Sequence, residues 1–282
     1  MRLLLFLTAF YLSSYCCAQL TGKTWIISNS SNALILSDNN TFIIDDGVYY
    51  KKPQTYLLDG DTITFIEKEL FSNLNDIEIF KQRQHKYYLL SETKDSLILI
   101  RCNETNYLGY NRDTVTLRDY QSLYDPTFSF RHIYFAATSC YGFCPDFKME
   151  ILSNGVVYFY GRLYTGRYKG TWKGHLSDKQ MSRLLAILRN SNIRNFPSGT
   201  GIPIDAPERR LIIKYGDHEL DFCGSDFPYT GHKLMAFLFT EYKNFRLKRC
   251  TGCRAFIEKS CFEIMREEHE TFMKEFIDTN IE

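Results

Sequence analysis

The strongest constraint on the fold is an alternation of apolar and charged side chains around one turn. Asn154-Gly155 is a strong two-residue hairpin signal because both residues accept a positive φ. Such a turn pairs Met149 with Tyr160 and Glu150 with Phe159. One face of the hairpin is then apolar and carries Phe147, Met149, Ile151, Val156, Tyr158 and Tyr160. A period of two with charged residues on the other face predicts an antiparallel sheet buried on one side.

Residues 128–249 continue this pattern with two amphipathic helices. A second two-residue turn, Gly216-Asp217, places Leu211 opposite Phe222 on the inner face. Ser177 begins a helix with a capping box, because a Gln follows three residues later. A last helix brings together Leu234, Leu238, Tyr242 and Phe245. The order strand, hairpin, helix, hairpin, helix predicts an α+β domain: one antiparallel sheet with both helices packed on one face.

Residues 19–119 are predicted to form a separate all-β domain, a small antiparallel barrel or sandwich. Their apolar runs are short and are separated by polar turns at the spacing typical of such folds. The predicted strands are 24–27, 33–36, 41–44, 48–50, 56–58, 62–66, 87–90, 97–100 and 114–117. Residues 120–127 are the predicted linker to the α+β domain. Residues 250–282 are predicted to be a Cys-rich appendix with a C-terminal helix.

Residues 1–18 have the pattern of a secretory signal peptide. Arg2 provides the positive start, an apolar run extends from Leu3 to Leu12, and Cys16 and Ala18 are small residues before the predicted cut. The run is too short to span a bilayer as a helix, and no other apolar stretch of that kind occurs. Tyr15 stands where a lipid anchor on Cys16 would need a small residue, which argues against a lipoprotein. We therefore expect an exported chain, periplasmic or extracellular, with no transmembrane segment after processing.

Charge balance and missing motifs narrow the function. The chain has 34 Lys+Arg and 33 Asp+Glu, so it lacks the positive excess on which nucleic-acid binding depends. The sequence contains no Gly-x-Ser-x-Gly, no phosphate loop and no dinucleotide fingerprint, and its six histidines are scattered. We predict no nucleic acid, no cofactor, no metal and no catalysis. A hydrolase using two acidic side chains such as Asp146 and Asp205 is an open alternative.

Two parts of the chain resemble known families. Cys140-Tyr141-Gly142-Phe143-Cys144-Pro145-Asp146-Phe147, followed by the Asn154-Gly155 hairpin, resembles a bacterial domain family of unknown function over about residues 128–245. That resemblance implies an exported setting and no established activity. Residues 19–119, through Leu20-Thr21-Gly22-Lys23-Thr24-Trp25, resemble the lipocalin-like domains of secreted bacterial proteins. This second resemblance implies a barrel whose interior is either a site for an apolar ligand or a filled core.

Export changes the meaning of the cysteines. The sequence has nine cysteines, and two of them lie in the predicted signal peptide. The remaining seven are an odd number, so at least one thiol is free or pairs between chains. We predict a Cys140–Cys144 disulfide, since Gly142 lets that loop tighten. Cys250 and Cys253 have the spacing of a thiol pair that opens a helix. A thiol–disulfide or zinc-binding protein using Cys140, Cys144, Cys250 and Cys253 is therefore the alternative function. The sequence does not determine the pairing of Cys102, Cys223 and Cys261.

Aromatic side chains predicted to point outward from the second sheet are the candidate binding surface. They are Phe159, Tyr164, Tyr168 and Trp172. Exposed rings suit contact with a protein, a peptide, a glycan or an apolar small molecule. The leading prediction is an exported, non-catalytic binding or structural protein.

Overall fold

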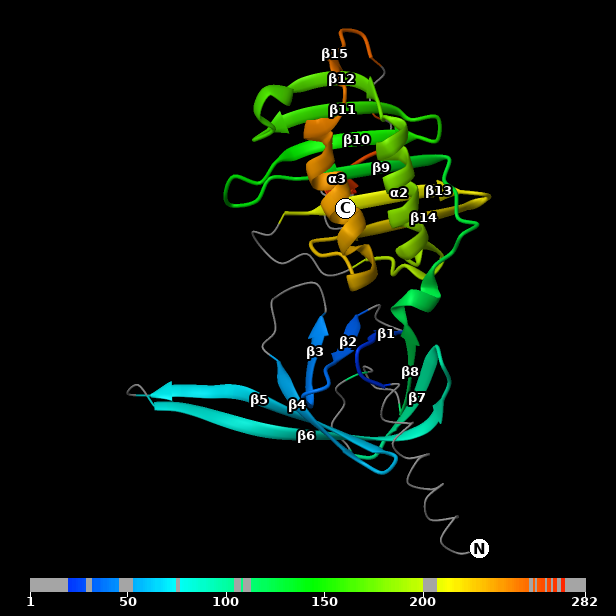
Figure 1. Ribbon diagram of the computed structural model, residues 1–282. Coiled ribbons are helices and arrows are strands. Elements are labelled where there is room, and N and C mark those ends of the chain that lie inside the picture. The colour runs from blue at the N-terminus through cyan, green and yellow to red at the C-terminus, as the bar shows by residue number, and fades with distance from the viewer. Residues whose placement is uncertain are drawn as a thin grey trace, which may run out of the picture. The chain divides into compact units, whose positions relative to one another are not determined.

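The chain divides into two compact units after Tyr124, with Pro228–Thr230 grouped with the first (Figure 1). The computed structural model describes residues 20–28, 32–45, 53–74, 77–103, 108, 113–199, 207–253, 256, 258–261, 263–264, 266–267 and 270–271. The predicted signal peptide at 1–18, the predicted strand at 48–50 and Asp205 lie outside the described residues.

The first unit is a closed antiparallel barrel of eight strands, in which β1 pairs with both β2 and β8. Its strands are β1 (Thr24–Ile27), β2 (Ala33–Leu36), β3 (Thr41–Asp45), β4 (Gln54–Asp59), β5 (Thr62–Leu74), β6 (Ile77–Glu92), β7 (Ser96–Arg101) and β8 (Thr114–Asp119). A closed barrel of this size is lipocalin-like in kind. β5 and β6 are longer than the others and continue beyond the barrel as a two-stranded hairpin (Figure 1).

Among the residues that the structure describes, large side chains fill the interior of the barrel. Trp25, Phe42, Phe65 and Tyr87 are fully buried, and Phe65 packs edge-on against Phe42 with 4.9 Å between ring centroids. The indole N–H of Trp25 donates to the carbonyl of Leu20 at 2.9 Å. An eight-stranded barrel is just wide enough for side chains to fill. The described barrel interior is therefore a packed core.

The second unit is a sheet of seven strands in the order β14-β13-β9-β10-β11-β12-β15, antiparallel throughout. The strands are β9 (His132–Ala137), β10 (Asp146–Leu152), β11 (Val156–Leu163), β12 (Gly170–His175), β13 (Arg209–Tyr215), β14 (His218–Gly224) and β15 (Lys248–Arg249). Short 3-10 helices connect several elements: η1 (Tyr120–Leu123), η2 (Gly166–Tyr168), η3 (Ile193–Asn195), η4 (Tyr229–Gly231) and η5 (Glu241–Asn244). A barrel followed by an antiparallel sheet with helices fits the predicted α+β class, although β12 and β15 were not predicted.

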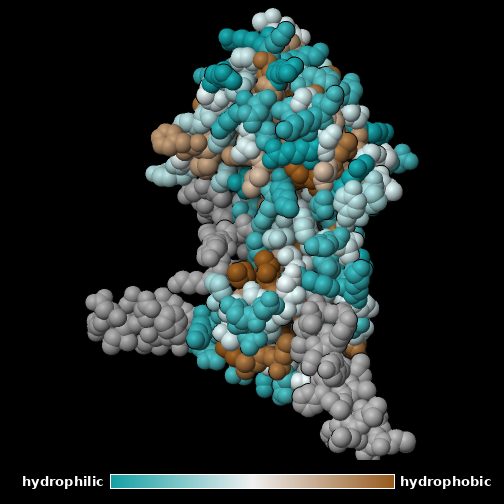
Figure 2. All heavy atoms as spheres, in the orientation of Figure 1, coloured by the Kyte–Doolittle hydropathy of each residue, from teal (hydrophilic) through white to brown (hydrophobic). Residues whose placement is uncertain are grey.

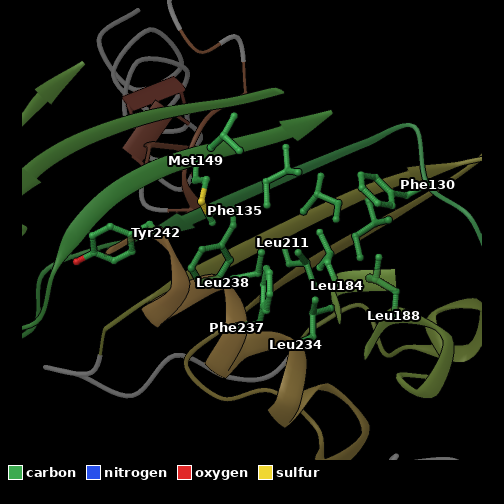
Figure 3. Close-up of a cluster of buried hydrophobic side chains, with 14 of the residues drawn as sticks. Phe130, Phe135, Met149, Leu184, Leu188, Leu211, Leu234, Phe237, Leu238 and Tyr242 are labelled. Atoms are coloured by element: carbon green, nitrogen blue, oxygen red, sulfur yellow. The ribbon is translucent and has the colours of Figure 1, made fainter. Parts of the chain in front are cut away.

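Two helices, α2 (Asp178–Asn190) and α3 (His232–Thr240), cover one face of this sheet (Figures 1 and 3). The predicted capping box is present: the backbone N–H of Ser177 donates to Gln180 at 2.9 Å, and the backbone N–H of Gln180 donates to the Ser177 hydroxyl. Leu184 and Leu188 of α2 are buried in the same core as Leu234 of α3 (Figure 3). Burial of this apolar stripe is what holds α2 on the sheet.

The β13–β14 hairpin has the predicted register. Leu211 pairs with Phe222, and Lys214 pairs with Glu219, whose carboxylate lies 3.3 Å from the ammonium. The two-residue turn at 216–217 fixes the register in which Leu211, Ile213, Leu220 and Phe222 share the face that packs on the helices, while Ile212 is buried on the opposite face.

The β10–β11 hairpin differs from its predicted register by one residue. Met149 pairs with Phe159 and Ile151 with Val157, so the loop has three residues, 153–155. The N–H of Gly155 donates to the carbonyl of Leu152 at 2.8 Å, and Gly155 has φ +85°. These are the features of a type I turn followed by a left-handed glycine. A shift of one residue turns every β11 side chain to the opposite face.

The predicted aromatic surface is wrong at Phe159, which the register shift turns into the core, and at Tyr168, which is buried in the β11–β12 connection. Phe159 is 0% exposed and stacks on Tyr242 in the core, with 4.7 Å between ring centroids. Tyr168 is also buried, and its hydroxyl donates to the carbonyl of Lys243 at 3.0 Å. Trp172 is half-buried against Tyr168. Of the four predicted residues, Tyr164 alone is exposed, at 52%.

Candidate binding site

The sheet face opposite the two helices, here called the outer face, is covered by residues after β15. Tyr134, Ala136 and Ile212 are buried on this face, although neither helix reaches it. Phe256 packs on them, with its ring centroid 6.4 Å from that of Tyr134. We call residues 250–271 the C-terminal segment. The described residues at 261, 263–264, 266–267 and 270–271 within it are helical.

Main-chain pairing at Cys250 and a disulfide at Cys261 fix this segment on the sheet. β15 pairs with β12, and the N–H of Cys250 donates to the carbonyl of Thr171 at 2.9 Å. Further along the segment, Cys261 is bonded to Cys223 of β14, with Cα atoms 6.2 Å apart. The segment therefore crosses the outer face between two fixed points.

A capping box sets the start of the helical part and supplies an ion pair with the sheet. The N–H of Ser260 donates to the Glu263 carboxylate at 2.6 Å, and the N–H of Glu263 donates to the Ser260 hydroxyl at 3.2 Å. The ammonium of Lys148 on β10 donates to both Glu263 oxygens, at 2.7 and 2.9 Å. Burial alone would raise the pKa of Glu263, but the hydrogen bonds from Lys148 and Ser260 outweigh it and hold that pKa below its ordinary value.

A pocket of about 480 Å³ lies between the C-terminal segment and strands β10 to β12. This volume is within the range of small-molecule binding sites. The pocket, here called the outer-face pocket, is lined by Lys148, Tyr160, Arg162, Thr171, Cys253, Phe256 and Glu263. Two cations, two aromatic rings, a hydroxyl and a carboxylate thus face one space. Such a set can orient a polar group while it covers an apolar one.

Asp146 adds a second carboxylate beside the pocket. Burial raises the pKa of Asp146, and the nearby Arg162 and Lys148 partly offset that effect. The Nε atom of Arg162 lies 3.7 Å from the carboxylate, and the Arg162 side chain is 53% exposed. Arg162 therefore pairs with Asp146 and still faces solvent. Because Asp205 lies outside the described residues, the predicted acidic pair stays a prediction.

The described residues contain three disulfides. Cys140–Cys144 and Cys250–Cys253 each have an S–S distance of 2.02 Å, and Cys223–Cys261 is the third. The 140–144 bridge was predicted from its loop. The third pair was not, because its members are 38 residues apart. The free cysteine among these residues is the exposed Cys102.

The predicted helix start at Cys250 and Cys253 is wrong. These residues flank a bend directly after β15, and the first helical residue described in the segment is Cys261. Among the described residues, no helix begins at this pair to lower a thiol pKa. Cys140, Cys144, Cys250 and Cys253 form two separate bonds, so they do not make one zinc site. The group found with metal-ligand geometry in the described part of the chain is Glu208, Cys223 and Cys261, whose two sulfurs are bonded to each other.

A second candidate surface lies at one end of the sheet, where the disulfide-closed β9–β10 loop meets the β11–β12 connection. Tyr141 and Phe143 are 93% and 86% exposed. The ring of Phe143 packs edge-on against Tyr164, with 5.3 Å between centroids. We call Tyr141, Phe143, Leu163 and Tyr164 the aromatic tip. Only Tyr164 of this tip was in the predicted surface.

Sequence reasoning missed most of the outer-face pocket. Lys148 was correctly placed on the charged face of its strand, but what covers that face was not predicted. One signal was available: Ser260 followed by Glu263 is a capping box, which marks a helix start. The contact between Lys148 and Glu263 spans 115 residues, and no local pattern encodes it.

Comparison with known proteins finds a similarity for part of the second unit. Residues 131–222 match the model of a family described as Domain of unknown function (DUF6438). This agrees with the resemblance of this region to a family of unknown function. No curated protein and no solved structure matches the chain. In the described part of the chain, every helix is too short or too polar to cross a bilayer.

Proposed function

We propose that this is an exported, non-catalytic binding protein and that the outer-face pocket is its ligand site. The observation that carries the proposal is how the pocket is built. Its floor comes from β10 to β12 and its cover from a segment about a hundred residues later, fixed by strand pairing, a disulfide and the Lys148–Glu263 ion pair. A pocket held in this way is preformed, so a ligand need not order it. The three disulfides favour an oxidising compartment.

The charges around the pocket favour a ligand that carries both signs or none. Lys148 and Arg162 are balanced by Glu263 and Asp146, at 2.7 and 3.7 Å. A strongly anionic ligand would have to displace one of these carboxylates. The rings of Tyr160 and Phe256 offer apolar contact between the charged groups. We infer a short peptide or a similar zwitterionic molecule with an aromatic or aliphatic group.

Filling the pocket tests this proposal. A library of di- and tripeptides is scanned for ligands by thermal shift, and the affinity of each hit is measured by isothermal titration calorimetry. Thr171→Trp places an indole in the pocket and should weaken binding at least tenfold. Thr114→Trp, at an exposed threonine of the first unit, is the matched control and should bind normally. The proposal fails if no peptide binds, or if the Thr171 variant binds as well as the control.

Thiol–disulfide exchange is the second candidate, favoured by Cys253 lining the same pocket. A dithiol bound there would reduce the Cys250–Cys253 bond by two electrons and leave as a disulfide. Titration against glutathione buffers, followed by thiol counting on intact protein, separates the two functions. An exchange protein requires this bond to be more oxidising than structural disulfides, whose potentials lie below about −300 mV. A binding protein requires it to stay oxidised under the same buffers.

A further inference from the structure

We propose that the second unit docks on an anionic phospholipid bilayer through the aromatic tip and the cationic sheet edge next to it. The proposed docking surface shares only Arg162 with the outer-face pocket. It rests on two surface features of the sheet: exposed apolar side chains on a rigid loop at one end, and exposed cations without exposed acids along the adjoining edge.

The aromatic tip exposes several large apolar side chains to solvent at one place on the surface. Tyr141 and Phe143 are almost fully exposed, and Leu163 is 47% exposed. Asp146 pairs with Leu163, so the β9–β10 loop and the end of β11 lie together. Figure 2 shows hydrophobic atoms projecting at this edge of the second unit, where Figure 1 places the β9–β10 loop. Contiguous exposed apolar groups of this kind mark interaction sites.

The loop is held in shape without help from the core. The Cys140–Cys144 bridge closes it, and Phe143 rests on Tyr164, which has φ +54°. On a free loop, the exposed side chains of Tyr141 and Phe143 would gain by collapsing onto the body. The bridge prevents that collapse and keeps the rings directed outward. The tip is therefore preorganised for contact with another surface.

Cations dominate the edge formed by β11, β12 and β15. Six exposed basic residues belong to these strands and to the β11–β12 connection: Arg162, Arg167, Lys169, Lys173, Lys248 and Arg249. Between residues 147 and 177 the one acidic residue is Glu150, and it is buried. The sequence has no acidic residue between Glu241 and Glu258. Figure 2 shows hydrophilic colouring over this part of the unit. A chain with a net charge of +1 thus concentrates positive charge at one edge.

Exposed aromatic rings beside exposed cations together favour one kind of binding partner, an anionic lipid surface. Cations near an anionic bilayer each contribute to binding, and aromatic rings prefer the level of the lipid headgroups. A soluble polyanion would pair with the cations but would leave Tyr141 and Phe143 in water. A neutral protein partner would use the rings and leave the cations unpaired. An anionic lipid surface uses both features at once.

Vesicle flotation tests the proposal on the full mature chain. Vesicles of phosphatidylcholine with 40% phosphatidylglycerol should bind the protein, and vesicles of phosphatidylcholine alone should not. Tyr141→Ala with Phe143→Ala should weaken binding at least tenfold, and Lys169→Ala about fivefold. The matched control is Leu57→Ala with Leu90→Ala, two exposed apolar residues of the barrel, which should bind normally.

A tryptophan at the tip reports insertion directly. In Phe143→Trp, anionic vesicles should shift the indole emission to shorter wavelength, and brominated lipid should quench it. The proposal is overturned if both vesicle types bind equally, if the tip variant binds like the control, or if heparin binds while vesicles do not. Thr171→Trp should keep vesicle binding, so failure of the pocket and failure of the docking surface can be told apart.

Discussion

Removing the Cys223–Cys261 disulfide should cost far more stability than removing Cys140–Cys144. In the chain-entropy model, the stabilisation from a disulfide grows as 1.5RT times the logarithm of the number of residues in the closed loop. The sequence separations are 38 and 4. The model gives about 4 kcal/mol for the first bridge and about 2 kcal/mol for the second at 25 °C. The difference of about 2 kcal/mol is the sharper quantity, because the length-independent part cancels.

The two bridges also differ in what they hold. Cys140–Cys144 closes a turn within one loop, whereas Cys223–Cys261 attaches the C-terminal segment to β14. Cys261 is buried, so its replacement also removes apolar packing. This packing loss adds to the entropic loss in the same direction. We therefore expect the difference between the two variants to be at least about 2 kcal/mol.

Urea unfolding of two double variants measures this difference. Cys223→Ala with Cys261→Ala is compared with Cys140→Ala with Cys144→Ala, so that neither leaves a single thiol. Every protein, including the reference, carries Cys102→Ser to prevent exchange. Each also carries Trp25→Phe, so that Trp172 fluorescence reports the second unit alone.

Two results would refute the reasoning. The first is an equal loss of unfolding free energy in the two variants, which would mean that loop length does not govern the contribution. The second is a loss below about 1 kcal/mol for the Cys223–Cys261 pair, against the expectation from its loop. That second result would mean that the C-terminal segment detaches before the sheet unfolds.

Three further predictions test the fold. Phe159→Ala should lower the unfolding free energy by about 3–5 kcal/mol in urea titrations, and Tyr160→Ala by less than about 1 kcal/mol, since only the first ring is in the core. A larger loss for Tyr160→Ala than for Phe159→Ala would instead support the register with a two-residue turn, in which Met149 pairs with Tyr160. Gly161→Ala should cost about 1–3 kcal/mol in the same assay, because a Cβ would collide with the carbonyl of Tyr168; an unchanged midpoint would contradict that contact. Glu263→Gln should cost about 1 kcal/mol at pH 7. Its folded pKa lies below the ordinary value, so the difference from wild type should be constant at neutral pH and vanish as acid protonates the carboxylate, which pH-dependent unfolding checks.

Core packing, and not the turn motif alone, explains why one hairpin register was predicted correctly and the other was wrong by one residue. Gly216-Asp217 forms the two-residue turn that its sequence indicates. Asn154-Gly155 is the stronger motif, yet Ser153 joins it in a three-residue loop. Both loops place a glycine at positive φ, so the motif alone does not separate them. The core separates them, because the observed register buries Phe159 against Tyr242.

The amino-acid sequence by itself determined the local features of this protein. The short strands of the barrel, the capping box at Ser177 and the Cys140–Cys144 bridge each depend on residues a few positions apart. Over such distances the backbone allows few arrangements, so a pattern indicates one structure.

Only the tertiary structure decided what covers the outer face and where charge gathers. The Cys223–Cys261 bond and the Lys148–Glu263 ion pair join residues 38 and 115 positions apart. Closing a long loop costs little more than closing a moderately long one, so chain length selects no particular partner. The packing of the whole sheet determines which residues become partners. The outer-face pocket and the cationic edge exist because that packing brings residues 248–253 back beside β12.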